Sequence, residues 1–212
     1  RSVSRGLGDV YKRQADTVRP ALQIVKTKPG NSIVSSCFIL VRPSATGENE
    51  VLAMGDCAIN IKPTEDELVE IAGETAKCAR VFGMDPQVAF LSYSTLGSGK
   101  GEDVDKMRNA ANRAKAKYPE LPIEGELQFD AAVSPRVART KCKDSAVAGH
   151  ANTFIFPDIN AGNIGYKIAQ RMGNFEAYGP ILLGLNAPIN DLSRGCNAIE
   201  VYSMAIITAA LA

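Results

Sequence analysis

The segment Phe154-Ile-Phe-Pro-Asp-Ile-Asn-Ala-Gly-Asn-Ile-Gly-Tyr-Lys167 passes from a short apolar run into a helical pattern. Its beginning predicts a strand over residues 152–156, and its continuation predicts a helix over residues 160–171. The same order, an apolar run followed by a helical pattern, recurs along most of the chain. Alternation of this kind is typical of a parallel sheet built from β-α-β units, so we expect an α/β fold.

Other segments predict the remaining elements. Thr64 and Glu67 have the spacing of a capping box, and apolar residues then repeat at helical spacing until Gly83. Ser134 followed by Pro135 predicts another helix start. Further strands are expected over residues 32–41, 51–59, 88–93, 127–131 and 178–183, the first two as a hairpin, and further helices over residues 102–117 and 197–211.

Composition and charge restrict the class of protein. The chain has 212 residues, of which 45% are hydrophobic and 22% are charged, and its formal net charge is +1. This size allows one or two domains, and these proportions describe an ordinary globular protein. No stripe of Lys and Arg with interleaved aromatics indicates nucleic-acid binding. Because no apolar run reaches the length of about 18 residues that a membrane span needs, and no signal peptide is evident, we expect a cytoplasmic protein.

The cysteines and the histidine disfavour several kinds of site. Five cysteines are an odd number and include no C-x-x-C pair, so we expect reduced thiols and neither a disulfide scaffold nor a structural zinc. His150 is the only histidine, and no G-x-S-x-G elbow is present, which disfavours a Ser-His-Asp triad. We therefore expect no bound metal and no triad.

The loop Leu96-Gly-Ser-Gly-Lys-Gly101 lies between a predicted strand and a predicted helix, where phosphate-binding loops occur. The Walker pattern would need glycine at Ser94 and a hydroxyl residue at Gly101, so the loop does not fit an ATP site. A glycine-rich turn can still present backbone N–H groups to a ligand, and a role in a cleft stays open.

Asp158, Asn160, Gly162 and Asn163 follow a predicted strand at the start of a predicted helix. Open α/β sheets commonly bind ligands at the carboxyl ends of their strands, which favours ligand contact by Asn160 and Asn163. The structural alternative is that Asp158 and Asn160 cap the helix, while Gly162 relieves a tight turn.

The segment Asn190-Asp-Leu-Ser-Arg-Gly-Cys196 precedes the predicted C-terminal helix. The guanidinium of Arg194 presents a planar set of donors that matches phosphate oxygens, and the N–H groups of a helix start add positive potential. Ser193, Arg194 and Gly195 therefore predict an anion site, and an ordinary polar turn is the alternative.

Several motifs in a fixed order resemble the C-terminal portion of the phosphate acetyltransferase family, from about residue 15 to residue 212. Related butyryltransferases share the architecture, and some malic enzymes carry a similar C-terminal domain. Besides the segments around Asn160 and Arg194, the resemblance takes in Pro20-Ala-Leu-Gln-Ile-Val-Lys-Thr27, Ser92-Tyr-Ser-Thr-Leu-Gly-Ser98, Leu127-Gln-Phe-Asp-Ala-Ala132 and Gly179-Pro-Ile-Leu-Leu-Gly-Leu185.

The resemblance implies a two-domain fold like that of the isocitrate and isopropylmalate dehydrogenases, with mainly parallel sheets and a cleft between the domains. Residues 32–179 would form the second domain, and residues 15–31 and 180–212 a remnant of an incomplete first domain. Residues 1–14 show no periodicity and match nothing in the family, so we expect a foreign or disordered segment there. A substantial upstream part of the family fold would then be missing.

The resemblance also implies roles for individual side chains. The arginine matching Arg194 grips phosphate, the serine matching Ser193 hydrogen-bonds in the reacting centre, and Arg19 matches a further arginine of the site. A carboxylate matching Glu200 is proposed as the base, where the family usually has aspartate. Gly195 and Cys196 would line the site; we interpret Cys196 as a lining thiol rather than a nucleophile because no histidine is near in sequence and the family reaction is direct attack.

Glu200 has a structural alternative. Asn197 and Glu200 are spaced as the first and last residues of a capping box. A carboxylate with an ordinary pKa of about 4.3 is a weak base for a thiol near about 8.5, so catalysis would require burial or a neighbouring like charge. Base and cap therefore remain two hypotheses for this residue.

The expected reaction is reversible transfer of an acetyl group between CoA and orthophosphate, with no tightly bound cofactor, acetyl-CoA and phosphate as substrates, and a homodimer as the assembly. The transfer needs a held phosphate, a stabilised oxyanion and a group that manages the thiol proton. One alternative is a non-catalytic acetyl-CoA-sensing domain, as in malic enzymes. Another is a phosphate butyryltransferase, which differs in its acyl-chain preference.

Overall fold

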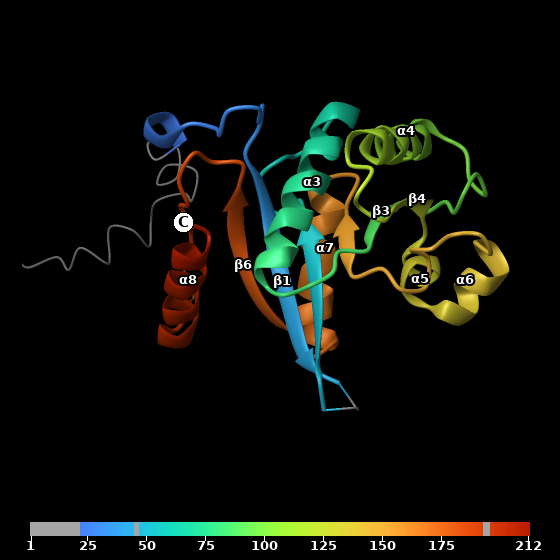
Figure 1. The fold of residues 1–212 in the computed structure, drawn as a ribbon. Helices are drawn as coiled ribbons and strands as arrows, with labels where there is room; N and C mark the ends of the chain where they lie inside the picture. The colour runs from blue at the N-terminus through green and yellow to red at the C-terminus, as the bar shows by residue number, and fades with distance from the viewer. Residues whose placement is uncertain (1–21, 45–46, 193–195) are drawn as a thin grey trace, which may run out of the picture.

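In the computed structural model, residues 22–44, 47–192 and 196–212 are described (Figure 1). Strands and helices alternate along most of the chain, which confirms the predicted α/β class. The elements are β1 (Ser35–Pro43), β2 (Asn49–Gly55), α3 (Glu65–Val81), β3 (Val88–Leu91), α4 (Glu102–Lys117), β4 (Ile123–Leu127), α5 (Phe129–Val133), α6 (Pro135–Lys141), β5 (Thr153–Ile155), α7 (Ile159–Met172), β6 (Glu176–Leu183) and α8 (Ala198–Ala210).

Among the described residues, six strands form one sheet in the order β4-β3-β5-β2-β1-β6. The four strands β4, β3, β5 and β2 run parallel to one another, so their carboxyl ends share one edge of the sheet. β1 pairs antiparallel with β2, as the predicted hairpin requires, and β6 pairs antiparallel with β1. The amino end of β1 and the carboxyl end of β6 therefore lie at that same edge.

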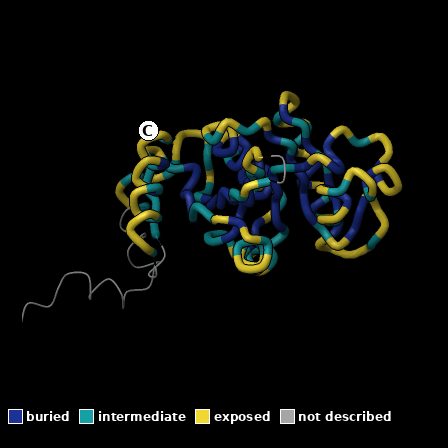
Figure 2. Tube along the Cα trace, turned by 90° about the horizontal axis from the view of Figure 1, so that it is seen from below, coloured by how far each residue is buried: buried dark blue, intermediate teal, exposed yellow. Residues whose placement is uncertain are grey.

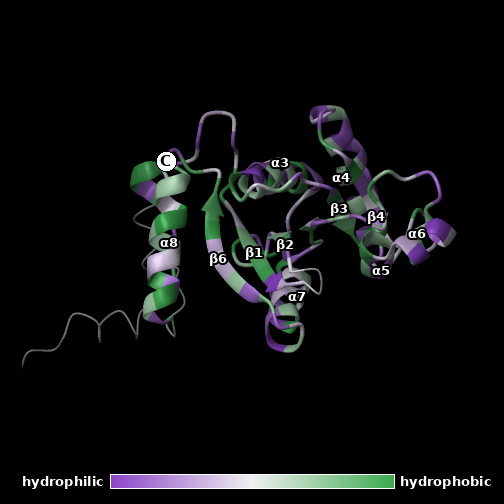
Figure 3. Cartoon of the chain, turned by 60° about the horizontal axis from the view of Figure 1, so that its bottom comes forward, coloured by the Kyte–Doolittle hydropathy of each residue, from purple (hydrophilic) through white to green (hydrophobic). Residues whose placement is uncertain are grey.

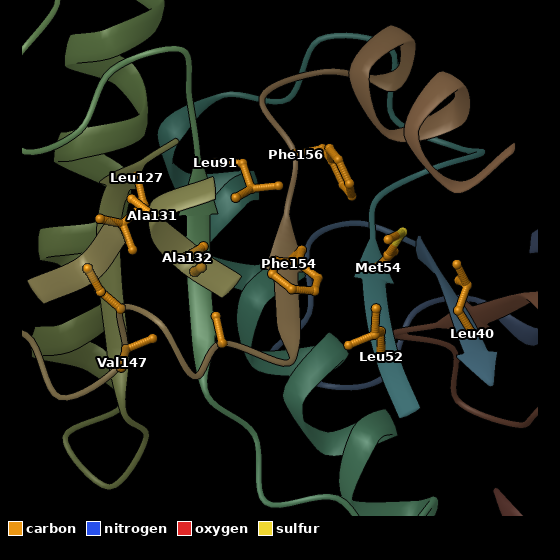
Figure 4. Packing of buried hydrophobic residues seen from close by; sticks show 14 of the residues in the cluster. Leu40, Leu52, Met54, Leu91, Leu127, Ala131, Ala132, Val147, Phe154 and Phe156 are labelled. Atoms are coloured by element: carbon orange, nitrogen blue, oxygen red, sulfur yellow. The ribbon is translucent and has the colours of Figure 1, made fainter. Parts of the chain in front are cut away.

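Helices cover both faces of the sheet (Figure 1). One face carries α3 and α4, whose apolar residues pack on Val88, Phe90 and Ile155. The other face carries α5, α6 and α7 over Leu91, Leu127 and Phe154. Figure 2 shows the buried strands between exposed outer surfaces, and Figure 4 shows Ala131 and Ala132 lying close to Leu91 and Phe154. The fold is thus a three-layer α/β/α arrangement.

The helix α3 shows why the sequence pattern was informative. Thr64 accepts a hydrogen bond from the Glu67 N–H, and the Glu67 carboxylate accepts one from the Thr64 N–H, so the predicted capping box is present. Gly83 follows the helix with a φ of 73°, a conformation that glycine adopts without strain. Leu68, Ile71 and Ala72 are buried on one face and contribute to the core.

The predicted strand over residues 127–131 is wrong. The strand is β4, which ends at Leu127, and residues 129–133 form the short helix α5. Two glutamates and a glycine in Ile123-Glu-Gly-Glu-Leu127 conceal the strand because they interrupt its apolar pattern. Burial of Ala131 and Ala132 against the sheet instead favours the helix.

The domain division at residues 31 and 179 stays a prediction, but the structure shows what crosses these positions. β6 includes residue 179, although its pairing with β1 shifts register between Tyr178 and Ile181. Residues 26–28 lie antiparallel to residues 184–186: the Lys28 N–H donates to the Gly184 carbonyl at 2.9 Å, and the Asn186 N–H donates to the Lys26 carbonyl at 3.0 Å. The two segments predicted for the first domain therefore contact each other.

Glu70 anchors the start of β1 to α3. Its carboxylate accepts hydrogen bonds from the Ser32 N–H at 3.0 Å, the Ser32 hydroxyl at 2.7 Å and the Ile33 N–H at 3.1 Å. Burial alone would raise the pKa of the Glu70 carboxyl, but these donors and the nearby Lys117 hold it below its ordinary value. The carboxylate thus stabilises the chain just after the predicted boundary at residue 31.

The helix α8 lies beside β6 at one end of the sheet (Figure 1). Met204 and Ile207 are buried against Ile181 and Leu183 of β6. The rest of the helix is mostly apolar as well, as Figure 3 shows, and Ile199, Tyr202 and Ile206 are exposed. None of the helices in the described ranges is long and apolar enough to cross a membrane.

Candidate active site

The carboxyl edge of the parallel strands is where ligands bind in open α/β sheets, and three of its turns contain buried or half-buried polar residues. β2 leads into Asp56, β3 leads into the loop of residues 92–101, and β5 leads into Asp158. Because the strands are parallel, these turns lie along one edge. This edge is the described part of the candidate site.

The turn after β2 is organised by the buried carboxylate of Asp56. Its exposed fraction is 2%, and it accepts hydrogen bonds from the Ser36 hydroxyl, the Ala58 N–H at 3.0 Å and the Asn60 N–H at 2.9 Å. The side-chain amide of Asn60 also donates to it. These donors engage both carboxylate oxygens, so Asp56 stabilises the turn and is not presented to a ligand.

The loop after β3 uses its backbone N–H groups internally. The Gly97 N–H donates to Glu126 Oε1 at 2.7 Å, and the Gly99 N–H donates to Ser94 Oγ at 2.8 Å. The Thr95 N–H donates to Ser98 Oγ at 2.9 Å. These amides are therefore engaged by the chain's own oxygens and do not form a phosphate cradle.

Glu126 is the group around which this loop is built. Its side chain is fully buried, and it accepts the Ser94 hydroxyl at 2.8 Å and the Arg108 Nε–H at 2.9 Å, in addition to the Gly97 N–H. Burial alone would raise the pKa of the Glu126 carboxyl, but these hydrogen bonds outweigh it and lower that pKa. The carboxylate, held ionised, fixes the loop between β3 and α4.

The start of α7 supports the structural interpretation of Asp158. The Asp158 carboxylate accepts the Ala161 N–H at 2.9 Å and caps the helix. Gly162 is buried, and a Cβ there would lie 2.4 Å from the Asp56 carbonyl oxygen, so the helix packs closely on the turn after β2. Asn163 donates to the Cys57 carbonyl at 3.0 Å, whereas Asn160 is exposed at the edge of the sheet.

The segment before α8 is described only in part. Ser193, Arg194, Gly195 and Arg19 lie outside the described residues. The Asn190 side chain accepts the Leu182 N–H at 2.8 Å and donates to Thr208 Oγ1 at 2.8 Å. Cys196 is half-buried and its thiol is free.

Glu200 forms the predicted capping box. Its carboxylate accepts the Asn197 N–H at 2.8 Å, and its own N–H donates to Asn197 Oδ1 at 3.0 Å. Glu200 lies in the first turn of α8 and Thr208 in the last, about 12 Å apart along the helix axis. Within the described ranges no hydrogen bond links this helix start to the turn that holds Asn160 and Asn163. Glu200 at the start of α8 and the pair Asn160 and Asn163 at the start of α7 therefore share no hydrogen bond in the described ranges.

Sequence reasoning missed Glu126, Arg108 and Asp56. Glu126 lies inside a strand whose polar appearance concealed it, and Asp56 lies within a predicted strand. Their partners Ser94 and Ser36 are far away in the sequence, so no local spacing indicates either cluster. Among the described residues, no group of His, Cys, Asp or Glu is arranged to hold a metal ion.

The family model for phosphate acetyl/butaryl transferase matches residues 7–209. The chain belongs to this family. The match begins inside the segment that we predicted to be foreign, and that assignment stays a prediction.

Curated relatives and solved structures are similar to this chain in sequence or in fold. A phosphate acetyltransferase of Bacillus subtilis is 57% identical over 198 residues, which are 93% of this chain and 60% of the relative. The crystal structure of a phosphotransacetylase from Streptococcus pyogenes is 59% identical, covers 95% of this chain and 60% of that chain, and superposes with a TM-score of 0.88. A branched-chain phosphotransacylase from Enterococcus faecalis, 24% identical, covers 92% of this chain and 70% of its own with a TM-score of 0.72, and so shares the fold.

The chain spans about 60% of the length of the curated relatives it matches. The family and its dehydrogenase-like α/β fold are thereby shown for this chain.

Proposed function

We propose that this chain carries the phosphate-binding part of an enzyme that transfers an acetyl group reversibly between CoA and orthophosphate. The observation that carries the proposal is the segment Ser193-Arg194-Gly195 in a chain that matches the family over residues 7–209. Acetyl-CoA and phosphate are the substrates, and the thiolate of CoA is the leaving group in one direction and the nucleophile in the other.

Arg194 would hold the phosphate as a bidentate partner, and Ser193 would donate a hydrogen bond to the reacting centre. Arg19 would supply a second guanidinium, while Gly195 and Cys196 would line the pocket. In a direct transfer the two substrates react with each other and form no covalent intermediate with the enzyme. Holding them in the correct orientation then supplies much of the rate enhancement. Asn160 and Asn163 would contact substrate from the start of α7.

Glu200 would manage the proton of the CoA thiol. The capping box supports a related role, because it fixes the start of α8 and directs its N–H groups toward an anion. The two roles are compatible, since a carboxylate can accept a backbone hydrogen bond and still accept a proton.

The cellular setting follows from the same proposal. The enzyme would act in the cytoplasm on small diffusible substrates, as a homodimer, with no tightly bound cofactor and without nucleic-acid or membrane partners. The absence of a membrane-spanning helix among the described residues is compatible with this setting.

The test is release of free thiol from acetyl-CoA by the purified chain, measured with and without phosphate. Phosphate-dependent release is expected, and Arg194→Ala should reduce kcat/KM by about a hundredfold or more, because a charge-assisted bidentate contact is lost. Arg194→Lys retains the charge without the planar geometry and should recover only part of the rate.

Near-normal turnover by Arg194→Ala, with unchanged KM for phosphate, would contradict the assigned role. Absence of release by the chain itself, together with release once the chain is joined to the upstream portion of a relative, would place catalysis in the longer protein. The malic-enzyme-like alternative predicts acetyl-CoA binding with no release in either experiment.

A further inference from the structure

Tyr93 is exposed but held in place. The exposed fraction of the residue is 62%. The phenol hydroxyl donates to the Lys100 carbonyl at 2.8 Å, across the loop that joins β3 to α4. The loop itself is anchored by the buried carboxylate of Glu126. The ring is therefore presented to solvent by a rigid support.

The glycines of this loop make room for the ring. A Cβ at Gly99 would lie 3.0 Å from a ring carbon of Tyr93, and a Cβ at Gly101 would lie 2.8 Å from its hydroxyl oxygen. One side of the ring thus rests on backbone that carries no side chain. This explains the two glycines that sequence analysis left without a role, since the Walker interpretation had failed.

The side chain of Gln128 connects the backbone of Tyr93 to a neighbouring cation. The Gln128 amide donates to the Tyr93 carbonyl at 2.9 Å, and the oxygen of that amide accepts the Lys141 ammonium at 2.7 Å. Lys141 also pairs with Asp130 at 3.1 Å, in an exposed ion pair of small energy. Phe129 follows Gln128 directly and is 49% exposed.

We propose that Tyr93 is the platform on which the adenine ring of CoA stacks, with the ammonium group of Lys141, which Gln128 links to the Tyr93 backbone, as a contact for its phosphates. This inference rests on the proposed function. A base that stacks on an aromatic ring is stabilised by the contact, and a pre-organised ring loses little conformational entropy on binding. The position at the carboxyl end of β3 is where open α/β sheets take their ligands.

The experiment uses the absence of tryptophan from the chain. Tyr93→Trp introduces a single tryptophan at the platform, which can be excited selectively over the remaining tyrosines, and adenosine 3′,5′-bisphosphate is the probe, because it is the nucleotide portion of CoA without the pantetheine arm. Saturable quenching of fluorescence is expected. The control is Met172→Trp at the far end of α7, where the side chain is 81% exposed and no response is expected.

No quenching at Tyr93→Trp, or equal quenching at both positions, would overturn the proposal. This readout needs no turnover, so it decides the platform even when the chain shows no acetyl transfer. Conversely, acetyl transfer without quenching would leave the proposed function intact and remove Tyr93 from it.

A kinetic measurement separates binding from a structural effect wherever turnover is observed. Tyr93→Ala should raise the KM for acetyl-CoA by about tenfold or more, since that is the fold-change of a lost stacking interaction, and leave the KM for acetyl-pantetheine unchanged. Tyr93→Phe keeps the ring and should recover most of the affinity. If Tyr93→Ala raised the KM for acetyl-CoA and the KM for acetyl-pantetheine equally, the ring would only support the loop, and the proposal would be overturned.

Discussion

At the residue scale, the buried carboxylate of Glu126 is the most consequential group that the structure describes. It joins β4, the loop after β3 and α4 through Ser94, Gly97 and Arg108. A buried carboxylate is tolerated only when it is paired and hydrogen-bonded. Arg108 supplies the opposite charge, and Ser94 and Gly97 supply further hydrogen bonds.

We expect Glu126→Gln to lower the free energy of unfolding at pH 7 by about 1–3 kcal/mol, because the amide cannot pair with the Arg108 guanidinium. Urea denaturation measures the change, and Glu120→Gln at an exposed position is the matched control. Equal stability of the two variants would show that the network contributes little.

The pH dependence of stability follows from the same carboxyl group. Its pKa is lower in the folded protein than in the unfolded chain, so its stabilisation is present above the unfolded value of about 4.3 and is lost as the pH falls through the folded value. Glu70, with a pKa shifted in the same direction, contributes in the same window. Urea denaturation measured between pH 7 and pH 3 should therefore show that the free energy of unfolding falls less with decreasing pH in Glu126→Gln than in the unmodified chain.

Glu200 can be tested as base and as cap separately. Glu200→Gln retains a side chain that can accept the Asn197 N–H, whereas Glu200→Ala removes this half of the capping box and leaves Asn197 as the N-cap. We expect both to lose acetyl transfer but only Glu200→Ala to lose about 1 kcal/mol of stability. Full activity in Glu200→Gln, measured by phosphate-dependent thiol release, would leave the residue with its structural role alone.

At the element scale, the contact between α7 and the turn after β2 sets the position of the edge that carries Asn160. A Cβ at Gly162 would clash with the Asp56 carbonyl oxygen. A Cβ at Gly165, one turn later, would lie 3.2 Å from the nearest carbon of the Phe156 ring. Both glycines lie in the helix interior, where alanine would otherwise be favoured by roughly 1 kcal/mol.

We expect Gly162→Ala to destabilise the protein by about 1–3 kcal/mol, because the backbone oxygen cannot move aside without displacing the turn. Gly165→Ala should be close to neutral, since the ring can shift by a few tenths of an ångström. Thermal unfolding of the two variants makes the comparison, and equal melting temperatures would contradict the close packing of α7.

The elements differ in how far their sequences predicted them. α3 and α4 have strong apolar periodicity, and residues 102–117 form the predicted helix with the same bounds. β4 and α5 were misassigned because a strand with two glutamates looks polar, and because the helix is favoured by burial of two alanines on the sheet. The clusters around Glu126 and Asp56 depend on the contacts of Ser94 with Glu126 and of Ser36 with Asp56, which are 32 and 20 positions apart and which no local pattern encodes.

At the scale of the whole molecule, the outer side of α8 is apolar and exposed. The exposed fraction changes sharply between adjacent residues of this helix: it is 52% for Ile206 and 8% for Ile207. Exposed apolar faces of this kind promote association between protein molecules.

We expect Ile206→Lys to reduce self-association, as seen by sedimentation velocity, without lowering the free energy of unfolding. Ile207→Lys should instead destabilise by several kcal/mol, because it buries an unpaired charge against β6. Equal destabilisation by the two variants would show that both faces of α8 are packed in solution.

The sequence by itself determined the α/β class, the order of most elements, the caps of α3, α6, α7 and α8, and the family to which the chain belongs. These features are local or ordered along the chain, so periodicity and short motifs encode them. Only the tertiary structure decided the antiparallel edge of the sheet at β6, the engagement of the loop amides by Glu126 and the anchoring of the Tyr93 backbone by Gln128. Each of these depends on groups that are distant in sequence and meet only when the sheet is assembled, and burial rather than local propensity then selects their conformation.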